Sequence, residues 1–268
     1  MTTPAPGGAL LELREVTKQF GGLKAVASLD LDVHAGELVG LIGPNGAGKT
    51  TAFNLVTGVY APTHGTIRFE GRPIHGLRPS AVARRGITRT FQNIRLFASR
   101  CCRDNVCIAA HQHARAGVLD AVLQTARGRA DEAALQRTAM EMLDTLGLAA
   151  QAELPANELP YGQQRRLEIA RALAGRPRLL LLDEPAAGLN PQESEELMRV
   201  IRMIRERFHV TILLIEHDMR VVMGICDRVA VLDYGVKIAE GTPDVIRRDP
   251  RVIEAYLGEE VPADLGAE

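Results

Sequence analysis

Apolar residues in this chain occur in short runs that alternate with stretches of helical periodicity. Continuous apolar runs at residues 38–43, 178–184 and 210–218 predict buried strands, and the partly alternating pattern at 23–33 predicts another strand, preceded by one at 10–16. Short apolar strands separated by helices are typical of an α/β fold. We therefore expect a mostly parallel core sheet that is covered on both faces.

Helical patterns follow these strands at residues 52–58, after Gly162 as far as Ala174, and at 191–208. A hairpin through Tyr234 and Gly235 and a terminal helix at 249–260 complete the predicted elements. In the helix at 191–208, the apolar residues that share one face are Leu197, Val200, Ile201 and Ile204.

Residues 104–148 also follow a helical pattern, and we expect them to form a separate lobe inserted into the sheet domain. A stripe of leucine and methionine in a helix is more often core than a binding surface, so we interpret this one as packing. Its members are Leu135, Met142, Leu143 and Leu146.

The segment GPNGAGKT at residues 43–50 matches the pattern G-x-x-x-x-G-K-[ST] between a strand and a helix. Its glycines let backbone N–H groups turn toward phosphate oxygens, and the following helix adds its positive dipole end. Lys49 supplies charge to the β- and γ-phosphates, Thr51 donates near the α-phosphate, and the Thr50 hydroxyl is a candidate Mg²⁺ ligand. A chance glycine-rich turn is the alternative, which the flanking strand and helix disfavour. The predicted nucleotide contacts are Gly43, Asn45, Gly46, Ala47, Gly48, Lys49, Thr50 and Thr51.

Two acids, Asp183 and Glu184, end a run of four leucines and reach the carboxyl edge of the sheet, where α/β proteins bind ligands. Asp183 is suited to hold Mg²⁺ through water, and Glu184 to orient and deprotonate an attacking water. His217 ends another strand at the same edge and is a candidate for positioning the γ-phosphate. The alternatives are structural: acids that cap a strand, and a structural histidine.

Composition narrows the function classes. With 32 Lys and Arg against 33 Asp and Glu, the net charge of −1 gives no reason to expect nucleic-acid binding. No apolar run approaches the length of a membrane-spanning helix, and the first residues lack the features of a signal peptide. We expect a cytosolic chain whose membrane role, if it has one, comes through a partner.

Four cysteines occur, at positions 101, 102, 107 and 226. A reducing cytosol argues against disulfides, and the spacing is not a usual zinc spacing. We interpret them as thiols without a metal.

In their order along the chain, these motifs resemble the ATP-binding subunits of ABC transporters. The resemblance spans residues 10–260. Beyond the phosphate-binding segment, it rests on TRTFQN with Gln92, LPYGQQRRLEIARAL at 159–173, LLLLDEP at 179–185, AAGLN at 186–190 and IEHD at 215–218.

This resemblance implies one P-loop, ABC-type nucleotide-binding domain over residues 1–268. A RecA-like core with an antiparallel β subdomain would occupy about 10–92 and 176–240. An α-helical lobe, which carries the signature segment LPYGQQRRLEIARAL at 159–173, would occupy about 93–175, and C-terminal helices would occupy 241–260.

The resemblance also assigns roles to further residues. Gln92 would contact Mg²⁺ and the attacking water while sensing the membrane partner, and Phe20 would stack on adenine unless it is a strand-end core residue. ATP would be sandwiched between the phosphate-binding segment of one ATPase and the signature of a second. The residues expected to act across that dimer are Pro160, Tyr161, Gly162, Gln163 and Asn190.

FGGLKAV, RTFQNIRLF and IEAYLGEE narrow the resemblance to importer subunits for branched-chain amino acids and related hydrophobic solutes. It implies a second, identical or homologous ATPase, two transmembrane permease subunits and a solute-binding protein, with this chain at the cytoplasmic face of the membrane. Urea or amide uptake, lipopolysaccharide export and a soluble ABC ATPase are the alternatives.

Three features depart from the family pattern. Pro160 stands where many members have a serine that reaches the γ-phosphate, but proline suits the start of a helix. We interpret it as a variant, and expect unequal hydrolysis at the two ATP sites if the partner ATPase differs. Asn190 replaces a common aspartate, which would weaken the link across the dimer. The run Arg100-Cys101-Cys102-Arg103 is either variation on a solvated surface or a contact matched to the membrane partner.

Overall fold

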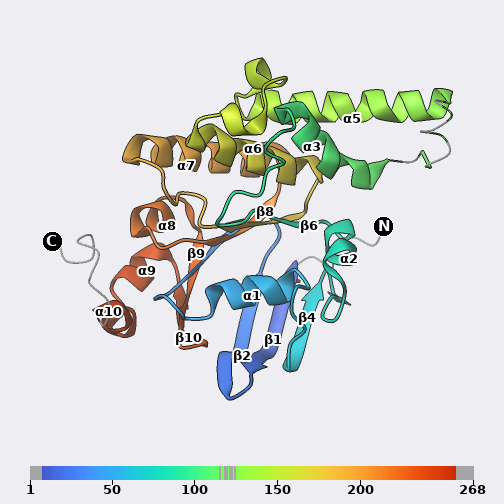
Figure 1. The fold of residues 1–268 in the computed structure, drawn as a ribbon. Helices are drawn as coiled ribbons and strands as arrows, with labels where there is room; N and C mark the ends of the chain where they lie inside the picture. The colour runs from blue at the N-terminus through green and yellow to red at the C-terminus, as the bar shows by residue number, and fades with distance from the viewer. Residues whose placement is uncertain (1–7, 115, 118–119, 121–122, 124, 258–268) are drawn as a thin grey trace.

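The computed structural model describes residues 8–114, 116–117, 120, 123 and 125–257. Its larger sheet has the strand order β10-β9-β3-β8-β7-β6 (Figure 1). All its neighbouring strands are parallel except β10, which pairs antiparallel with β9, so the predicted mostly parallel sheet is confirmed. The strands are β3 (Leu38–Ile42), β6 (Ile87–Arg89), β7 (Leu179–Asp183), β8 (Thr211–Ile215), β9 (Arg228–Asp233) and β10 (Val236–Gly241).

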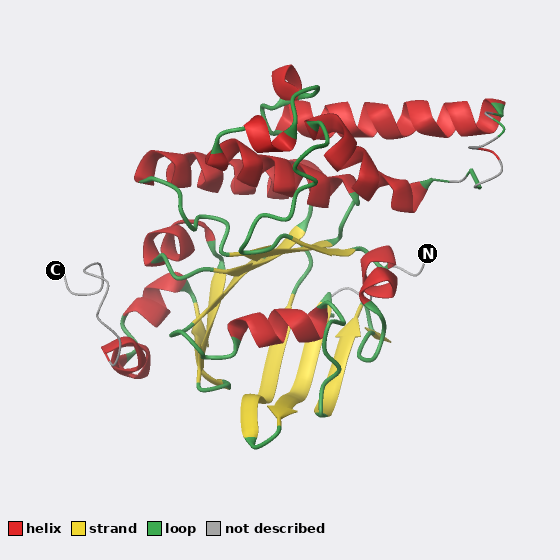
Figure 2. Ribbon diagram, viewed as in Figure 1, coloured by secondary structure: helices red, strands yellow, loops and turns green. Residues whose placement is uncertain are grey.

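A second, antiparallel sheet has the order β2-β1-β4-β5. Figure 2 shows this sheet and one helix on the same side of the larger sheet. Its strands are β1 (Leu11–Phe20), β2 (Leu23–Val33), β4 (His64–Phe69) and β5 (Arg72–Pro73), and the helix is α1 (Lys49–Val56). The antiparallel β part expected from the family resemblance is therefore present.

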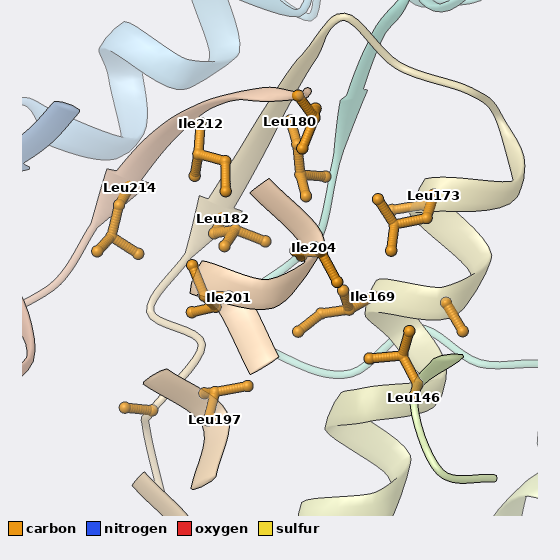
Figure 3. Packing of buried hydrophobic residues seen from close by; sticks show 14 of the residues in the cluster. Leu146, Ile169, Leu173, Leu180, Leu182, Leu197, Ile201, Ile204, Ile212 and Leu214 are labelled. Carbon is orange, nitrogen blue, oxygen red and sulfur yellow. The ribbon is translucent and has the colours of Figure 1, made fainter. Parts of the chain in front are cut away.

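Alternation along the central strands divides their side chains between two cores. Leu180 and Leu182 of β7 face one core, whereas Leu179 and Leu181 face the other. The first core is closed by helices, as Figure 3 shows for residues of α6 (Tyr161–Ala174) and α7 (Pro191–Phe208). The second is closed by α1 and the antiparallel sheet. Burying one such leucine stabilises the fold by about 1.5–3 kcal/mol, which explains why both faces are apolar.

The predicted stripe in α7 is confirmed. Leu197, Ile201 and Ile204 are buried, and Val200 is partly buried against them. The hairpin turn at Tyr234-Gly235 is also confirmed, with positive φ at both residues. Further helices are α2 (Pro79–Arg84), α8 (Met219–Ile225), α9 (Pro243–Arg247) and α10 (Pro250–Leu257).

The helical stretch predicted at 104–148 is divided in the structure. Its first helix, α3 (Cys102–Ala110), ends well before α5 (Ala126–Thr145) begins. The start of α5 is set by Thr125, whose hydroxyl accepts a hydrogen bond from the Gly128 N–H at 3.1 Å. The stripe Leu135, Met142, Leu143 and Leu146 is buried as predicted.

Helices α3, α5 and α6 pack against one another at one end of the molecule (Figure 1). The boundaries expected for the lobe and the core stay a prediction. Residues 258–260 of the predicted terminal helix lie outside the described residues. Among the residues described, none of the helices has both the length and the hydropathy needed to cross a membrane.

Candidate functional site

The segment at 43–50 forms the turn between β3 and α1. Gly43, Gly46 and Gly48 have φ of 146°, 79° and 99°. A Cβ at Gly43 would collide with the Leu232 carbonyl oxygen, and one at Gly48 with the Ala25 carbonyl oxygen. Glycine is therefore required at both positions by conformation and by close approach of the backbone.

Lys49 lies inside this turn, with 8% of its surface exposed. Its Nζ donates hydrogen bonds to the carbonyl oxygens of Gly43 at 2.5 Å and Pro44 at 2.9 Å. These bonds hold the ammonium group where backbone N–H groups and the start of α1 favour an anion.

A cavity of about 370 Å³ opens beside the turn. It brings together residues 45–51 of the phosphate-binding segment with Gln92 and Glu184, which the sequence separates widely. Four of its lining residues, Leu23, Lys24, Ala25 and Tyr234, were not among the predicted site residues. The full lining is Leu23, Lys24, Ala25, Asn45, Gly46, Ala47, Gly48, Lys49, Thr50, Thr51, Gln92, Glu184 and Tyr234.

Phe20 is not among the residues that line this cavity. Its ring lies edge-on to Tyr60, with 5.2 Å between centroids, and the Lys18 Nζ is 5.0 Å from its centroid. Phe20 is 41% exposed, so it is not a core residue. Its stacking on adenine stays a prediction.

The three predicted catalytic side chains meet at one carboxylate. Gln92 Nε2 donates to Glu184 Oε2 at 2.7 Å, and His217 Nδ1 lies 3.7 Å from the same oxygen. The Glu184 side chain is only 17% exposed, whereas that of His217 is 60% exposed. Because Glu184 lines the cavity beside the phosphate-binding turn, its carboxylate can act on a group that is bound there.

Asp183 is buried and pairs with Arg89, whose Nη2 is 2.5 Å from Asp183 Oδ2. Arg89 also donates to Asn54 Oδ1 at 2.6 Å and therefore links β6 and α1 to the end of β7. Arg89 was not among the predicted site residues, because the three-residue strand β6 that carries it was not predicted. The carboxylate of Asp183 and the hydroxyl of Thr50 are hard oxygen donors of the kind that Mg²⁺ prefers.

Glu216 is a further residue of the site that sequence analysis missed. It is fully buried and accepts hydrogen bonds from the N–H groups of Ala186 at 2.8 Å and His217 at 3.1 Å. Burial raises the pKa of Glu216. The side chain joins the segment after Glu184 to the segment that carries His217. An acid inside the apolar run at 210–218 is the signal that could have identified it.

The signature residues lie at the start of α6, away from this cavity. Pro160 occupies the N-cap with extended backbone (φ −54°, ψ 150°), as suits a residue that cannot donate an N–H. Tyr161 donates from its hydroxyl to the Ala187 carbonyl at 3.2 Å, and a Cβ at Gly162 would lie 3.1 Å from Glu193. Gln163 is half-buried in the first turn.

Asn190 begins α7 within a reciprocal capping box. Its side-chain oxygen accepts from the Glu193 N–H at 2.9 Å, and the Glu193 carboxylate accepts from the Asn190 N–H at 3.0 Å. Asn190 therefore has a clear local function. Its action across a dimer, like that of the signature residues, stays a prediction.

The run at 100–103 is not simply a solvated surface. Cys102 is fully buried, and the segment pairs by backbone hydrogen bonds with residues 152–156. Arg103 forms an ion pair with Glu153, while Arg100 is exposed. All four cysteine thiols of the chain are free.

Two protein families match this chain. The family described as "ABC transporter" matches residues 26–187. A second, described as "Branched-chain amino acid ATP-binding cassette transporter", matches residues 236–262.

Two curated relatives are similar over most of the chain. The high-affinity branched-chain amino acid transport ATP-binding protein BraF of Pseudomonas aeruginosa is 48% identical over 250 residues, which is 93% of this chain and 98% of the relative. LivG of Escherichia coli, with the same description, is 48% identical over 251 residues and the same shares of both chains.

Solved structures agree with the fold. A nucleotide-free ATP-binding cassette from an ABC transporter has a TM-score of 0.82 at 29% identity, covering 94% of this chain and 100% of the other. A cassette solved in its ADP conformation has a TM-score of 0.81 at 28% identity, covering 94% and 99%. The chain belongs to the ABC transporter family, in which it is an ATP-binding and ATP-hydrolysing subunit.

Proposed function

We propose that this chain is the energy-coupling ATPase of an importer for branched-chain or other hydrophobic amino acids. The observation that supports hydrolysis best is the meeting of Gln92 and His217 at the Glu184 carboxylate, beside the phosphate-binding turn. The solute class is taken from the printed names of relatives that are 48% identical to this chain.

In the proposed mechanism, the N–H groups of residues 43–50 and the Lys49 ammonium bind the phosphates of ATP. Glu184 takes a proton from a water molecule whose oxygen attacks the γ-phosphorus, and the bond to the leaving oxygen of ADP breaks. Gln92 orients this water, and His217 positions the γ-phosphate. Thr50, Asp183 and Gln92 would hold a Mg²⁺ ion, which neutralises phosphate charge when bound.

The proposed partners are a second, identical or homologous ATPase, two transmembrane permease subunits and, indirectly, a solute-binding protein. Pro160 to Gln163 would then serve the partner's ATP. The location is the cytoplasmic face of the membrane, held there by the permeases.

An apolar groove supports permease docking. It encloses about 410 Å³ between α2, α3 and α6, and a helix with an apolar face would fit such a surface. Its apolar lining includes Val59, Val82, Ile87, Phe91, Ile108 and Ala109.

The test is reconstitution of the complete transporter in liposomes. We expect ATP-dependent uptake of leucine, and ATP hydrolysis that rises when the leucine-loaded binding protein is added. A complex carrying Glu184→Gln is the matched control, because it keeps all subunits and loses the proposed base. Uptake of urea or amides instead of leucine would replace the proposed solute. Failure to associate with any permease would favour the soluble ATPase alternative.

A further inference from the structure

Helix α6 carries a cluster of three charged side chains that are largely buried in the protein. None of them lines the nucleotide cavity. Arg165 and Glu168 are each 1% exposed, and their closest atoms are 3.3 Å apart. Arg171 Nη2 lies 3.7 Å from the same carboxylate and is 15% exposed. Because buried charges are costly, such a cluster is retained only where further hydrogen bonds complete it.

Those further hydrogen bonds go to the loop that carries Gln92. Arg165 donates from Nη1 to the Phe91 carbonyl at 2.8 Å and from Nη2 to the Gln92 carbonyl at 2.9 Å. Glu168 Oε1 accepts from the N–H groups of Phe91 at 3.3 Å and Arg95 at 3.4 Å. The pair therefore satisfies both donors and acceptors of this loop from one helix.

The same arginine also reaches the segment after Glu184. Arg165 Nη2 donates to the Tyr161 hydroxyl at 3.0 Å, and that hydroxyl donates to the Ala187 carbonyl at 3.2 Å. The Arg165 guanidinium thus connects the backbone of Gln92 with the segment that follows Glu184. Glu184 is the residue that accepts a hydrogen bond from the Gln92 side chain.

We propose that Arg165 and Glu168 are positioning residues for hydrolysis. They hold the backbone of residues 91–95 on α6, so that the Gln92 carboxamide keeps its 2.7 Å contact with Glu184 and moves with the helix that carries the signature. This inference rests on the proposed roles of Gln92 and Glu184.

A double-mutant cycle tests the inference in the purified transporter complex. Arg165→Met is expected to lower kcat for ATP about tenfold and to leave KM within about twofold, because Arg165 does not line the nucleotide cavity. Arg165→Lys should recover part of this loss, since lysine keeps the positive charge but lacks the planar guanidinium fork that bonds both carbonyls and the Tyr161 hydroxyl. In a Gln92→Ala background, Arg165→Met should cause no further loss of kcat, because residues that act through one another are not additive.

Two further variants keep the test decisive. Glu168→Gln preserves the shape of the side chain and replaces Arg165→Met in the same cycle if that variant fails to fold. Glu168→Gln should lower kcat only where Gln92 is present. Arg14→Met removes an exposed arginine from its pair with Asp32 and is the control, with kcat unchanged.

An equal loss of kcat in both backgrounds, or no loss at all, would overturn the positioning role while leaving the role of Gln92 intact. If Gln92→Ala alone hydrolyses ATP at the unsubstituted rate, the proposed role of Gln92 is wrong, and the positioning role fails with it.

Discussion

Glu184 receives contacts from two side chains that lie far from it in the sequence, and its own backbone is unusual. Its φ of 46° falls in the left-handed region, which costs a non-glycine residue about 1–3 kcal/mol. The Glu184 N–H donates to the Ile215 carbonyl at 2.9 Å, which holds this conformation at the sheet edge.

Replacement of this carboxylate tests the proposed base. Glu184→Gln is expected to lower kcat for ATP hydrolysis at least about 100-fold, the upper range for loss of a general base being about 10⁴. ATP affinity should change little, because the phosphate-binding turn is untouched. Phosphate release and binding of a fluorescent ATP analogue measure the two quantities. Glu195→Gln, on the exposed face of α7, is the control. Near-normal hydrolysis by Glu184→Gln would assign the base to another group.

Burial of two cysteine side chains, Cys102 and Cys226, predicts that their thiols react slowly. Burial raises the pKa of Cys102 to about 11 and that of Cys226 to about 12. Since the thiolate is the reactive form, less than about one thiol in a thousand is reactive at pH 8. We expect iodoacetamide to leave both residues unmodified in the folded protein, as measured by mass spectrometry. Labelling in urea is the control, and rapid labelling of the native protein would contradict their burial.

At the scale of single elements, helix α7 shows that Asn190 is an effective N-cap residue. Its capping box is complete with asparagine, so no aspartate is needed to begin the helix. The substitution therefore has a local explanation that does not depend on a partner.

Urea unfolding tests this explanation. Asn190→Ala should lower the free energy of unfolding by about 1 kcal/mol, because an N-cap acceptor is lost. Asn190→Asp should stay within about 0.5 kcal/mol of the unsubstituted protein, since aspartate caps equally well and suits the positive end of the helix. Equal stability of all three proteins would show that the box contributes nothing.

Elements with a continuous apolar run or an apolar stripe were predicted, and elements without either were missed. The stripes in α5 and α7 and the apolar runs of β3, β7 and β8 were assigned correctly. The strand β6 and the helix α2 were missed, because Ile87 is the single buried apolar residue of β6 and Val82 that of α2. The break between α3 and α5 was also missed, since the residues on both sides share one helical pattern.

At the scale of the whole molecule, the surface near residue 100 is a candidate contact with the membrane partner. Arg103 is engaged by Glu153 within the chain, whereas Arg100 is exposed at the edge of the helical lobe. Arg100 alone therefore tests a contact with the permease without disturbing an internal ion pair.

Arg100→Glu is expected to reduce co-purification with the permease subunits and solute uptake, because it reverses the charge at the proposed contact. ATP hydrolysis by the isolated subunit should not change, and unfolding should shift by no more than about 0.5 kcal/mol. Arg129→Glu, on the exposed face of α5, is the control. Unchanged assembly and uptake would favour variation without a partner.

The sequence by itself determined the α/β class, the phosphate-binding turn and the strand ends that carry Asp183, Glu184 and His217. It could do so because each of these is a contiguous pattern whose meaning depends on neighbouring residues. Only the tertiary structure brought Gln92 to Glu184 across 92 positions and Arg89 to Asp183 across 94. It alone placed Arg165 against the loop of Gln92 and left Phe20 outside the cavity lining. Contacts of this kind depend on how strands and helices from distant parts of the chain pack, which no local pattern encodes.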